Sequence, residues 1–315
     1  MTPVLTITLN PALDIFGSIN EIEIGPKLRC EGGQIDAGGG GVNVSRAIKI
    51  LGGDSEAFVA TAGVLGDVLV KQIRKHDIEP IRYETDGHTR QSLSIFEELS
   101  GKQLRLILPG PIWTQAQIDG LLECVLLHTK DSAIVVASGS LPPGVPEDFY
   151  INLNTALRQK NARMVLDTSN NVLMTSVKSV QRPYYVLRMD RLEAEFLAGH
   201  SFPTPIEMAA FAQKMVNDNV AEIVILARGA EGSVFASATE RFHVQPPKTP
   251  VRSVVGAGDS FVGALTMTLA NGGSLQEAAI LATATASSAV QTSASGLCVR
   301  EVVDQIMIEC VTAAL

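Results

Sequence analysis

The chain has 315 residues, of which 46% are hydrophobic and 18% are charged, and this composition excludes an intrinsically disordered protein. Its 33 Asp and Glu residues outnumber its 25 Lys and Arg residues, so the formal net charge at pH 7 is −8. An acidic chain without a run of basic residues is a poor candidate for a general nucleic-acid-binding protein. An anionic substrate would need locally placed cations to offset the overall repulsion.

The N-terminal sequence predicts a β-strand, not a targeting signal, because apolar and Thr side chains alternate over Val4–Leu9 without a preceding basic region. The longest weakly polar stretch, Ala278–Val290, is too short and too rich in Thr and Ser to span a bilayer. The four cysteines are scattered and form no CxxC pair, which disfavours a disulfide framework or a zinc site. We therefore expect a cytoplasmic protein that does not interact with membranes.

The first hundred residues contain short strand candidates around one predicted helix. Strands are expected at Val4–Leu9, Ala57–Thr61, Ile81–Glu84, Gln91–Glu97 and Gln103–Leu108. The helix is expected over Asn43–Leu51, where Gly52 and Gly53 provide a C-terminal signal. Alternating polar and apolar residues in Phe16–Ile24 and Gln91–Leu108 predict a small, half-exposed sheet at one edge. Such a sheet could cover an active site or pair with another subunit.

From about residue 114 onward, amphipathic helices and continuous apolar strands follow each other along the chain. The expected elements are helix Gln115–His128, strand Ala133–Ala137, helix Glu147–Gln159, strand Met164–Asp167, strand Tyr184–Leu187, helices Arg191–Leu197 and Pro205–Asn217, strand Ile223–Ala227, and helices Asp259–Ala270, Leu275–Gln291 and Arg300–Ala314. This order predicts a parallel sheet that helices cover on both faces.

The strongest chemical motif is Val255–Phe261, in which two glycines and a carboxylate precede an apolar helix. Glycines at a helix N-terminus let backbone N–H groups point at an anion, and the helix dipole adds partial positive charge. The alternative interpretation is a capped turn, with Asp259 as the capping residue. Two glycines flanking Ala257 better suit a general base beside an anion hole for a transferring phosphoryl group.

Two further glycine-rich segments precede or follow predicted elements. Gly38–Gly41 leads into a helix that presents Asn43 in its first turn, which favours close approach of a ligand over a merely flexible loop. Ala227–Gly232 follows an apolar strand and could wrap a nucleotide phosphate, although a tight connection between strands needs glycines too. Neither segment is a Walker A loop or a dinucleotide-binding GxGxxG motif, so both of those readings are disfavoured.

Four segments of the chain together resemble the motifs of the ribokinase/PfkB family of sugar kinases, in the family's order along nearly the whole chain. They are Asn10–Asp14, Gly38–Ala47, Ser138–Gly144 and Val255–Ser260. The resemblance implies a ribokinase-like three-layer α/β/α sandwich with a mostly parallel central sheet. It also implies one kinase domain over residues 1–315, with a small β-sheet lid formed by about 12–36 and 88–108.

Within the family, the sequence is most similar to the PfkB-type 6-phosphofructokinases. Lys27–Cys30, Gly40, Thr89–Gln91 and Leu108–Gly110 carry this likeness. It implies ATP-dependent phosphorylation of fructose 6-phosphate to fructose 1,6-bisphosphate, a step of glycolysis. A tagatose-6-phosphate kinase or a 1-phosphofructokinase is the alternative, although those branches tend to have Lys at position 40. A regulator that binds sugar phosphate or nucleotide with little catalysis is a further alternative.

The resemblance also assigns residues around the acceptor sugar. Asp259 matches the catalytic base, and Gly256, Ala257 and Gly258 match the anion hole. Positions that match the sugar-binding residues are Asp14, Gly39, Gly40, Asn43 and Ser140. Arg90, Lys27 and Arg29 would hold the phosphate that the acceptor already carries, because Arg offers a bidentate fork and Lys a point charge.

The nucleotide side of the motif set departs from the family pattern. The family's usual Asn-x-x-Glu is Asp190–Glu193 here, and Arg188 stands in place of the usual Lys. Ala227 replaces a usual Ser or Thr, and Ser253–Val254 replaces a usual Asp-Thr, so a polar group is missing at each of these places. These changes leave ATP affinity and metal dependence open. The implied ATP-binding residues are Arg188, Asp190, Ala227, Gly229, Gly232, Ser253, Val255 and Ala286. Asp190 and Glu193 would hold Mg²⁺ through water, since Mg²⁺ prefers oxygen ligands. The family pattern further implies a homodimer that pairs through the lid.

Overall fold

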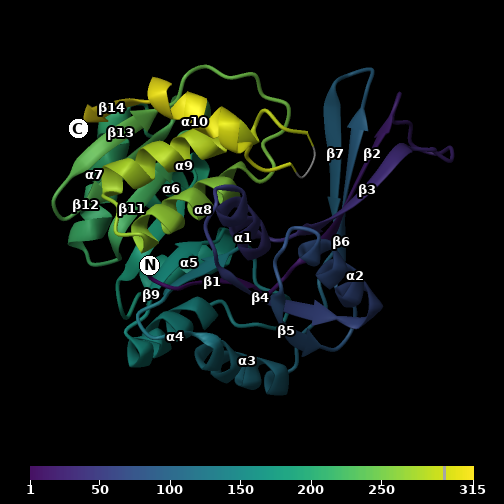
Figure 1. Cartoon of the computed structure of the whole chain (residues 1–315), viewed down its shortest axis with the longest axis horizontal. Helices are drawn as coiled ribbons and strands as arrows, with labels where there is room; N and C mark the ends of the chain where they lie inside the picture. Colours follow the sequence, from purple (N-terminus) through teal and green to yellow (C-terminus); the bar gives the residue numbers. More distant parts are fainter. Residues whose placement is uncertain (294–295) are drawn as a thin grey trace.

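The computed structural model describes residues 1–293 and 296–315, and within them ten strands form one large sheet (Figure 1). The strands from β11 to β5 are parallel, and β12, β13 and β14 extend the sheet antiparallel at one edge. In spatial order they are β14 (Val311–Ala314), β13 (Arg241–Gln245), β12 (Ser233–Ser237), β11 (Ala221–Ala227), β10 (Tyr184–Met189), β9 (Arg163–Asp167), β8 (Ile134–Ser138), β1 (Val4–Thr8), β4 (Glu56–Ala62) and β5 (Pro80–Thr85).

Helices pack on both faces of this sheet and give the expected three-layer α/β/α sandwich. One apolar core joins the sheet to α1 (Gly40–Ile50), α8 (Ala257–Ala270), α9 (Leu275–Ala289) and α10 (Arg300–Glu309). The other core joins it to α3 (Gln115–His128), α4 (Phe149–Ala156), α5 (Asn170–Lys178), α6 (Arg191–Ala198) and α7 (Pro205–Asn217). A smaller apolar cluster lies under α2 (Gly63–Arg74). Buried strands that are apolar on both faces, such as β8, explain why the sheet is covered twice.

A second, four-stranded sheet projects from the body of the molecule, as Figure 1 shows, and we call it the lid. Its strands, in spatial order, are β3 (Glu31–Gly38), β2 (Ala12–Ile19), β6 (Arg90–Glu97) and β7 (Lys102–Ile107). Alternation along the strands places Asp14, Ser92 and Arg105 on one face. The expected second, small sheet is therefore present, and its strands fall within or next to segments 12–36 and 88–108.

Some expected elements differ in the structure. The helix expected over Arg300–Ala314 ends at Glu309, because the β-branched Val311 and Thr312 continue as β14 and pair with the open edge at β13. The strand expected over Phe16–Ile24 is wrong in its bounds, since β2 already ends at Ile19. Helices α2 and α5 were not predicted, and the helix expected to reach Gln291 ends at Ala289.

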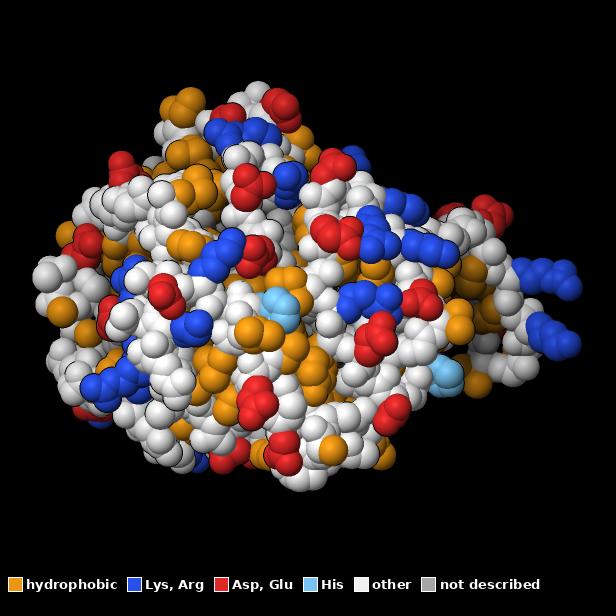
Figure 2. Space-filling view, turned by 60° about the horizontal axis from the view of Figure 1, so that its bottom comes forward, with side chains coloured by type: hydrophobic (Ala, Val, Ile, Leu, Met, Phe, Trp, Pro, Cys, Tyr) orange, Lys and Arg blue, Asp and Glu red, His pale blue; other side chains and the backbone are white. Residues whose placement is uncertain are grey.

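No helix in the described part of the chain is long and apolar enough to cross a bilayer. On the molecular face drawn in Figure 2, acidic and basic side chains are interspersed, and no continuous basic patch covers that face.

Candidate active site

Two cavities meet at the N-terminus of α8. The smaller, of about 330 Å³, lies between the lid and the body, and the larger, of about 650 Å³, lies between α8, α9 and the loop before α8. Val254 lines both, Val255, Gly256 and Asp259 line the smaller, and Ala257 and Gly258 line the larger. The segment 254–259 is thus the wall between two ligand-sized cavities.

Asp259 lies in the first turn of α8 and is held by two neighbouring side chains. Its Oδ2 accepts a hydrogen bond of 2.9 Å from Asn43 Nδ2, and its Oδ1 accepts one of 3.4 Å from Ser138 Oγ. Burial, and then the negative charge of Asp167, raise the pKa of Asp259 from 3.8 to about 6. A carboxylate with this pKa is ionised at neutral pH and is basic enough to accept a proton.

The glycines before Asp259 are required by the backbone and by the close approach of a cation. Gly256 precedes the helix in the left-handed conformation, with a φ of 76°, and no side chain caps the first turn of α8. A Cβ at Gly258 would lie 3.1 Å from Nη1 of Arg188. The N-terminus of α8 and the Arg188 guanidinium therefore lie beside each other, which suits a negatively charged group.

Arg188, near the end of β10, lines the larger cavity and forms an ion pair with Asp167. Its Nη1 is 3.0 Å from Asp167 Oδ1, and Asp167 Oδ2 accepts a hydrogen bond of 3.2 Å from Ser138 Oγ. Burial alone would lower the pKa of Arg188, but the ion pair with Asp167 outweighs it and raises this pKa. Ser138 thus bridges the carboxylates of Asp167 and Asp259, and it has one hydroxyl proton for the two of them.

The smaller cavity brings Asp14, Gly39, Gly40, Asn43 and Arg90 together, as the sequence predicted. Burial raises the pKa of Asp14 to about 6, against the positive charges of Arg90 and Arg105. Nε of Arg90 donates to the backbone oxygen of Asn10 at 3.1 Å, which fixes the guanidinium at the base of the lid. A Cβ at Gly40 would lie 2.3 Å from Ser138 Oγ, so a larger residue there would displace the backbone.

Three predicted substrate residues do not line this cavity. Lys27 and Arg29 are exposed in the segment between β2 and β3. Ser140 is also exposed, and its Oγ accepts a hydrogen bond of 3.1 Å from Asn10 Nδ2. Within one chain, the cations that line the cavity are Arg90 and Arg105, among the residues that the structure describes.

The larger cavity contains most of the predicted nucleotide residues. Arg188, Ala227, Gly229, Gly232 and Ala286 all line it. Val255 lies instead on the wall of the smaller cavity, and Ser253, Asp190 and Glu193 line neither of the two. The loop Pro246–Val254 and helix α9 enclose the larger cavity.

Asp190 and Glu193 cap helix α6 reciprocally. The backbone N–H of Glu193 donates to Asp190 Oδ1 and that of Asp190 to Glu193 Oε2, both at 2.8 Å. Burial, and then the charges of Asp190 and Asp167, raise the pKa of Glu193 to about 7. No group of three or more metal-ligating side chains is found among the described residues. The cap uses one oxygen of each carboxylate, and the other oxygen of each is of the kind that a hydrated Mg²⁺ accepts as a ligand through its water.

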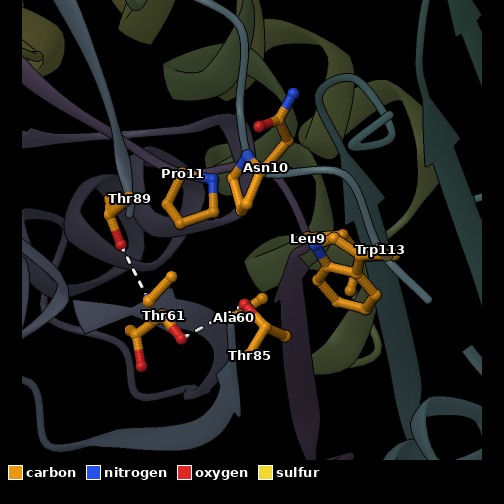
Figure 3. Close-up of a pocket in the computed structure, with 10 residues that line it drawn as sticks. Leu9, Asn10, Pro11, Ala60, Thr61, Thr85, Thr89 and Trp113 are labelled. Atoms are coloured by element: carbon orange, nitrogen blue, oxygen red, sulfur yellow. Dashed lines mark hydrogen bonds between the residues drawn. The ribbon is translucent and has the colours of Figure 1, made fainter. Parts of the chain in front are cut away.

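Four residues of the site were missed by the sequence reasoning: Asn10, Arg105, Ser138 and Asp167. Asn10 and Ser138 are the first residues of the family motifs Asn10–Asp14 and Ser138–Gly144. Arg105 lies in a strand whose register only the fold defines. Asn10 also lines a small cavity with Thr61, Thr85 and Thr89 (Figure 3), whose volume of about 10 Å³ leaves room for about one water molecule. The Asn10 side chain thus joins the end of β1 to Ser140, and its backbone joins it to Arg90.

The chain is similar to known sugar-phosphate kinases in sequence and in structure. The chain is 33% identical over 304 residues to the ATP-dependent 6-phosphofructokinase isozyme 2 of Mycobacterium tuberculosis, covering 96% of this chain and 88% of that protein. It is 31% identical over 287 residues to a 1-phosphofructokinase of Xanthomonas campestris, covering 89% and 88%. The crystal structure of Escherichia coli phosphofructokinase-2 with fructose 6-phosphate superposes with a TM-score of 0.91 at 31% identity, over 98% and 99% of the two chains.

The family model of the pfkB carbohydrate kinases matches residues 11–301, which include both cavities and the wall between them. This match and the relatives above extend over the lid as well as the sandwich. The chain belongs to the pfkB family of carbohydrate kinases.

Proposed function

We propose that this protein is an ATP-dependent 6-phosphofructokinase, which converts fructose 6-phosphate and ATP to fructose 1,6-bisphosphate and ADP in glycolysis. The observation that carries the proposal is the position of Asp259, at the wall between a cavity lined by two arginines and a cavity of nucleotide size. The arginines fit an acceptor that already carries a phosphate.

In this mechanism, Asp259 accepts the proton of the acceptor hydroxyl as that oxygen attacks the γ-phosphorus of ATP. The new O–P bond forms while the bond from the γ-phosphorus to the bridging oxygen of ADP breaks. The N-terminus of α8 and Arg188 stabilise the negative charge of the transferring group. Asn43 and Ser138 hold the Asp259 carboxylate during the transfer.

Asp190 and Glu193 would hold Mg²⁺ through water beside the phosphates, where the ion supplies charge neutralisation. Because the Asp190 and Glu193 carboxylates also cap α6, each commits one oxygen to the helix. Arg188 contributes a resident positive charge at the same place.

A substrate panel with Mg-ATP tests the proposed activity. We expect fructose 6-phosphate to have the highest kcat/KM among fructose 6-phosphate, fructose 1-phosphate, tagatose 6-phosphate and ribose. A preference for fructose 1-phosphate or tagatose 6-phosphate would favour the other branches of the family. Those branches tend to have Lys at position 40, where a Cβ would lie only 2.3 Å from Ser138 Oγ in this structure. Ribose as the best substrate would contradict a phosphate-binding role for Arg90. Thermal stabilisation by sugar phosphates without turnover would favour a regulator.

We also infer that the lid pairs with the lid of a second copy. Ile15, Ile35, Leu93 and Leu106 lie in one row across its four strands, on the face opposite Asp14, and Ile35 and Leu106 are exposed. An exposed apolar face of this kind is typical of an interface. Lys27 and Arg29, which do not line the cavity of their own chain, would then serve an acceptor phosphate only from a neighbouring copy.

Substitution of Leu106 by Glu tests the pairing. Light scattering should give the native protein a mass twice the 33.5 kDa of one chain, and Leu106→Glu should shift the mass to one chain at micromolar concentration. The matched control is Ile308→Glu on α10, since Ile308 is 87% exposed and lies outside the lid. A dimer that persists in Leu106→Glu would place the interface elsewhere.

A further inference from the structure

Helix α1 contains a buried arginine one turn after Asn43. Arg46 is only 5% exposed, although its side chain carries a positive charge. Its Nη1 donates to the side-chain oxygen Oδ1 of Asn43 and to the backbone oxygen of Ala37, at 3.2 Å in both cases. Ala37 lies near the end of β3, so Arg46 connects the catalytic helix face to the root of the lid.

The contact with Arg46 determines which way the Asn43 amide points. A guanidinium group can only donate hydrogen bonds, so the Asn43 atom that faces it must be the carbonyl oxygen. The amide nitrogen then faces Asp259 and donates to its Oδ2 at 2.9 Å. A rotation of the amide by 180° would direct N–H groups at the guanidinium and an oxygen at the carboxylate, and both contacts would be repulsive.

We propose that Arg46 is a positioning residue that fixes the orientation of the Asn43 amide, so that Asn43 donates a hydrogen bond to Asp259. The inference rests on the proposed role of Asp259 as the base. Arg46 itself does not line either cavity, and it acts on the proton acceptor through Asn43.

The charges around this relay favour the same arrangement. Burial lowers the pKa of Arg46, and the carboxylates of Asp36, Asp14 and Asp259, which attract the guanidinium, offset this only in part. Asp259 also faces Asp167 from β9, Arg188 from β10 and Ser138 from β8. Against the repulsion from Asp167, the hydrogen bond from Asn43 lowers the pKa of Asp259.

The test replaces Arg46 by Met, which keeps much of the volume, and by Lys, which keeps the charge but not the fork. Without Arg46 the Asn43 amide can present its oxygen to Asp259, which favours the protonated carboxyl. We expect Arg46→Met to move the acid limb of the kcat profile upward by about one pH unit, which lowers kcat about twofold at pH 7 and about fivefold at pH 6. Arg46→Lys should show a smaller shift, because Lys can still donate to Asn43.

A double-mutant cycle with Asn43→Ala separates positioning from general support of the fold. If Arg46 acts through Asn43, Arg46→Met should shift the acid limb far less in the Asn43→Ala background than in the native chain. The matched control is Arg182→Met, because Arg182 also donates to backbone oxygens, those of Asn154 and Ala162, but lies away from the site. This control should lower the melting temperature without moving the acid limb.

The pKa of Asp259 can also be followed without turnover, by NMR of chains labelled with ¹³C at the Asp carboxyl carbons and assigned with Asp259→Asn. An unchanged titration of Asp259 in Arg46→Met, or strictly additive effects in the cycle, would overturn the inference. If Arg46→Met does not fold, the same criteria apply to Arg46→Lys. Full activity of Asp259→Asn would instead contradict the proposed function, while the carboxyl titration would still report on Arg46.

Discussion

Replacing Asp259 by Asn is expected to lower kcat by about 10²–10⁴-fold, because the acceptor hydroxyl loses the group that takes its proton. The KM values for both substrates should change little, since Asn keeps the shape of the side chain and its contacts with Asn43 and Ser138. Steady-state kinetics with fructose 6-phosphate and Mg-ATP measure both quantities. A control variant, Asp218→Asn, changes an exposed carboxylate at the end of α7 and should retain native kinetics.

The same variant should be more stable than the native chain at pH 8. Burial raises the pKa of Asp259 to about 6, above its ordinary 3.8, so ionisation of Asp259 costs stability at high pH. Two pKa units correspond to about 3 kcal/mol, and partial exposure reduces the expected gain to about 1–2 kcal/mol. The gain should shrink as the pH falls from 6 towards 4, where the native carboxyl is protonated. Denaturant unfolding at both pH values measures it.

Two outcomes would argue against this assignment. Retention of more than a tenth of the native kcat in Asp259→Asn would mean that another group takes the proton. A gain in stability that is equal at pH 8 and pH 4 would mean that the buried charge is not its cause. An acid limb of the native kcat/KM profile between pH 6 and 7 would agree with the raised pKa values of Asp259, Asp14 and Glu193.

Replacing Arg90 by Met is expected to raise the KM for fructose 6-phosphate by about 10–100-fold, the effect of losing hydrogen bonds to a charged group worth about 1.5–3 kcal/mol. The turnover of unphosphorylated fructose should be nearly unchanged, because the lost contact is to the phosphate. Steady-state kinetics with the two sugars separates phosphate binding from general damage to the site.

Arg105→Met provides the matched comparison. Arg105 lines the same cavity but is exposed on β7, so solvent screens its charge and a smaller rise in KM is expected. A loss of activity that is equal for fructose 6-phosphate and fructose in Arg90→Met would contradict the phosphate role. It would point instead to Asp14, whose ionisation Arg90 supports.

The candidate site could be predicted from the sequence largely because its backbone motifs are local. The glycines before Asp259 and before Asn43 indicate anion binding through helix N-termini, which depends on residues adjacent in the chain. The parallel sheet also followed from apolar strands that alternate with amphipathic helices. Residues of these two glycine-rich motifs line the cavities: Asn43 and Asp259 line the smaller one, and Gly258 lines the larger one.

Long-range contacts could not be predicted in the same way. Arg105 reaches the cavity only because β7 pairs with β6, and Asp167 meets Arg188 only because β9 and β10 are neighbours. The strand β14 depends on an open edge at β13, which the sequence of residues 311–314 does not reveal. Lys27 and Arg29 have the right chemistry for a phosphate, but the lid places them outside the cavity of their own chain.

The acceptor cavity is assembled from two separate parts of the molecule. Asp14, Arg90 and Arg105 belong to strands of the lid, whereas Asn43 and Asp259 belong to helices of the body. The affinity for the sugar therefore includes the free energy of holding the lid in its binding position against the body. Natural sequence changes far out on the lid could tune the sugar concentration at which the enzyme works without altering a single contact to the sugar.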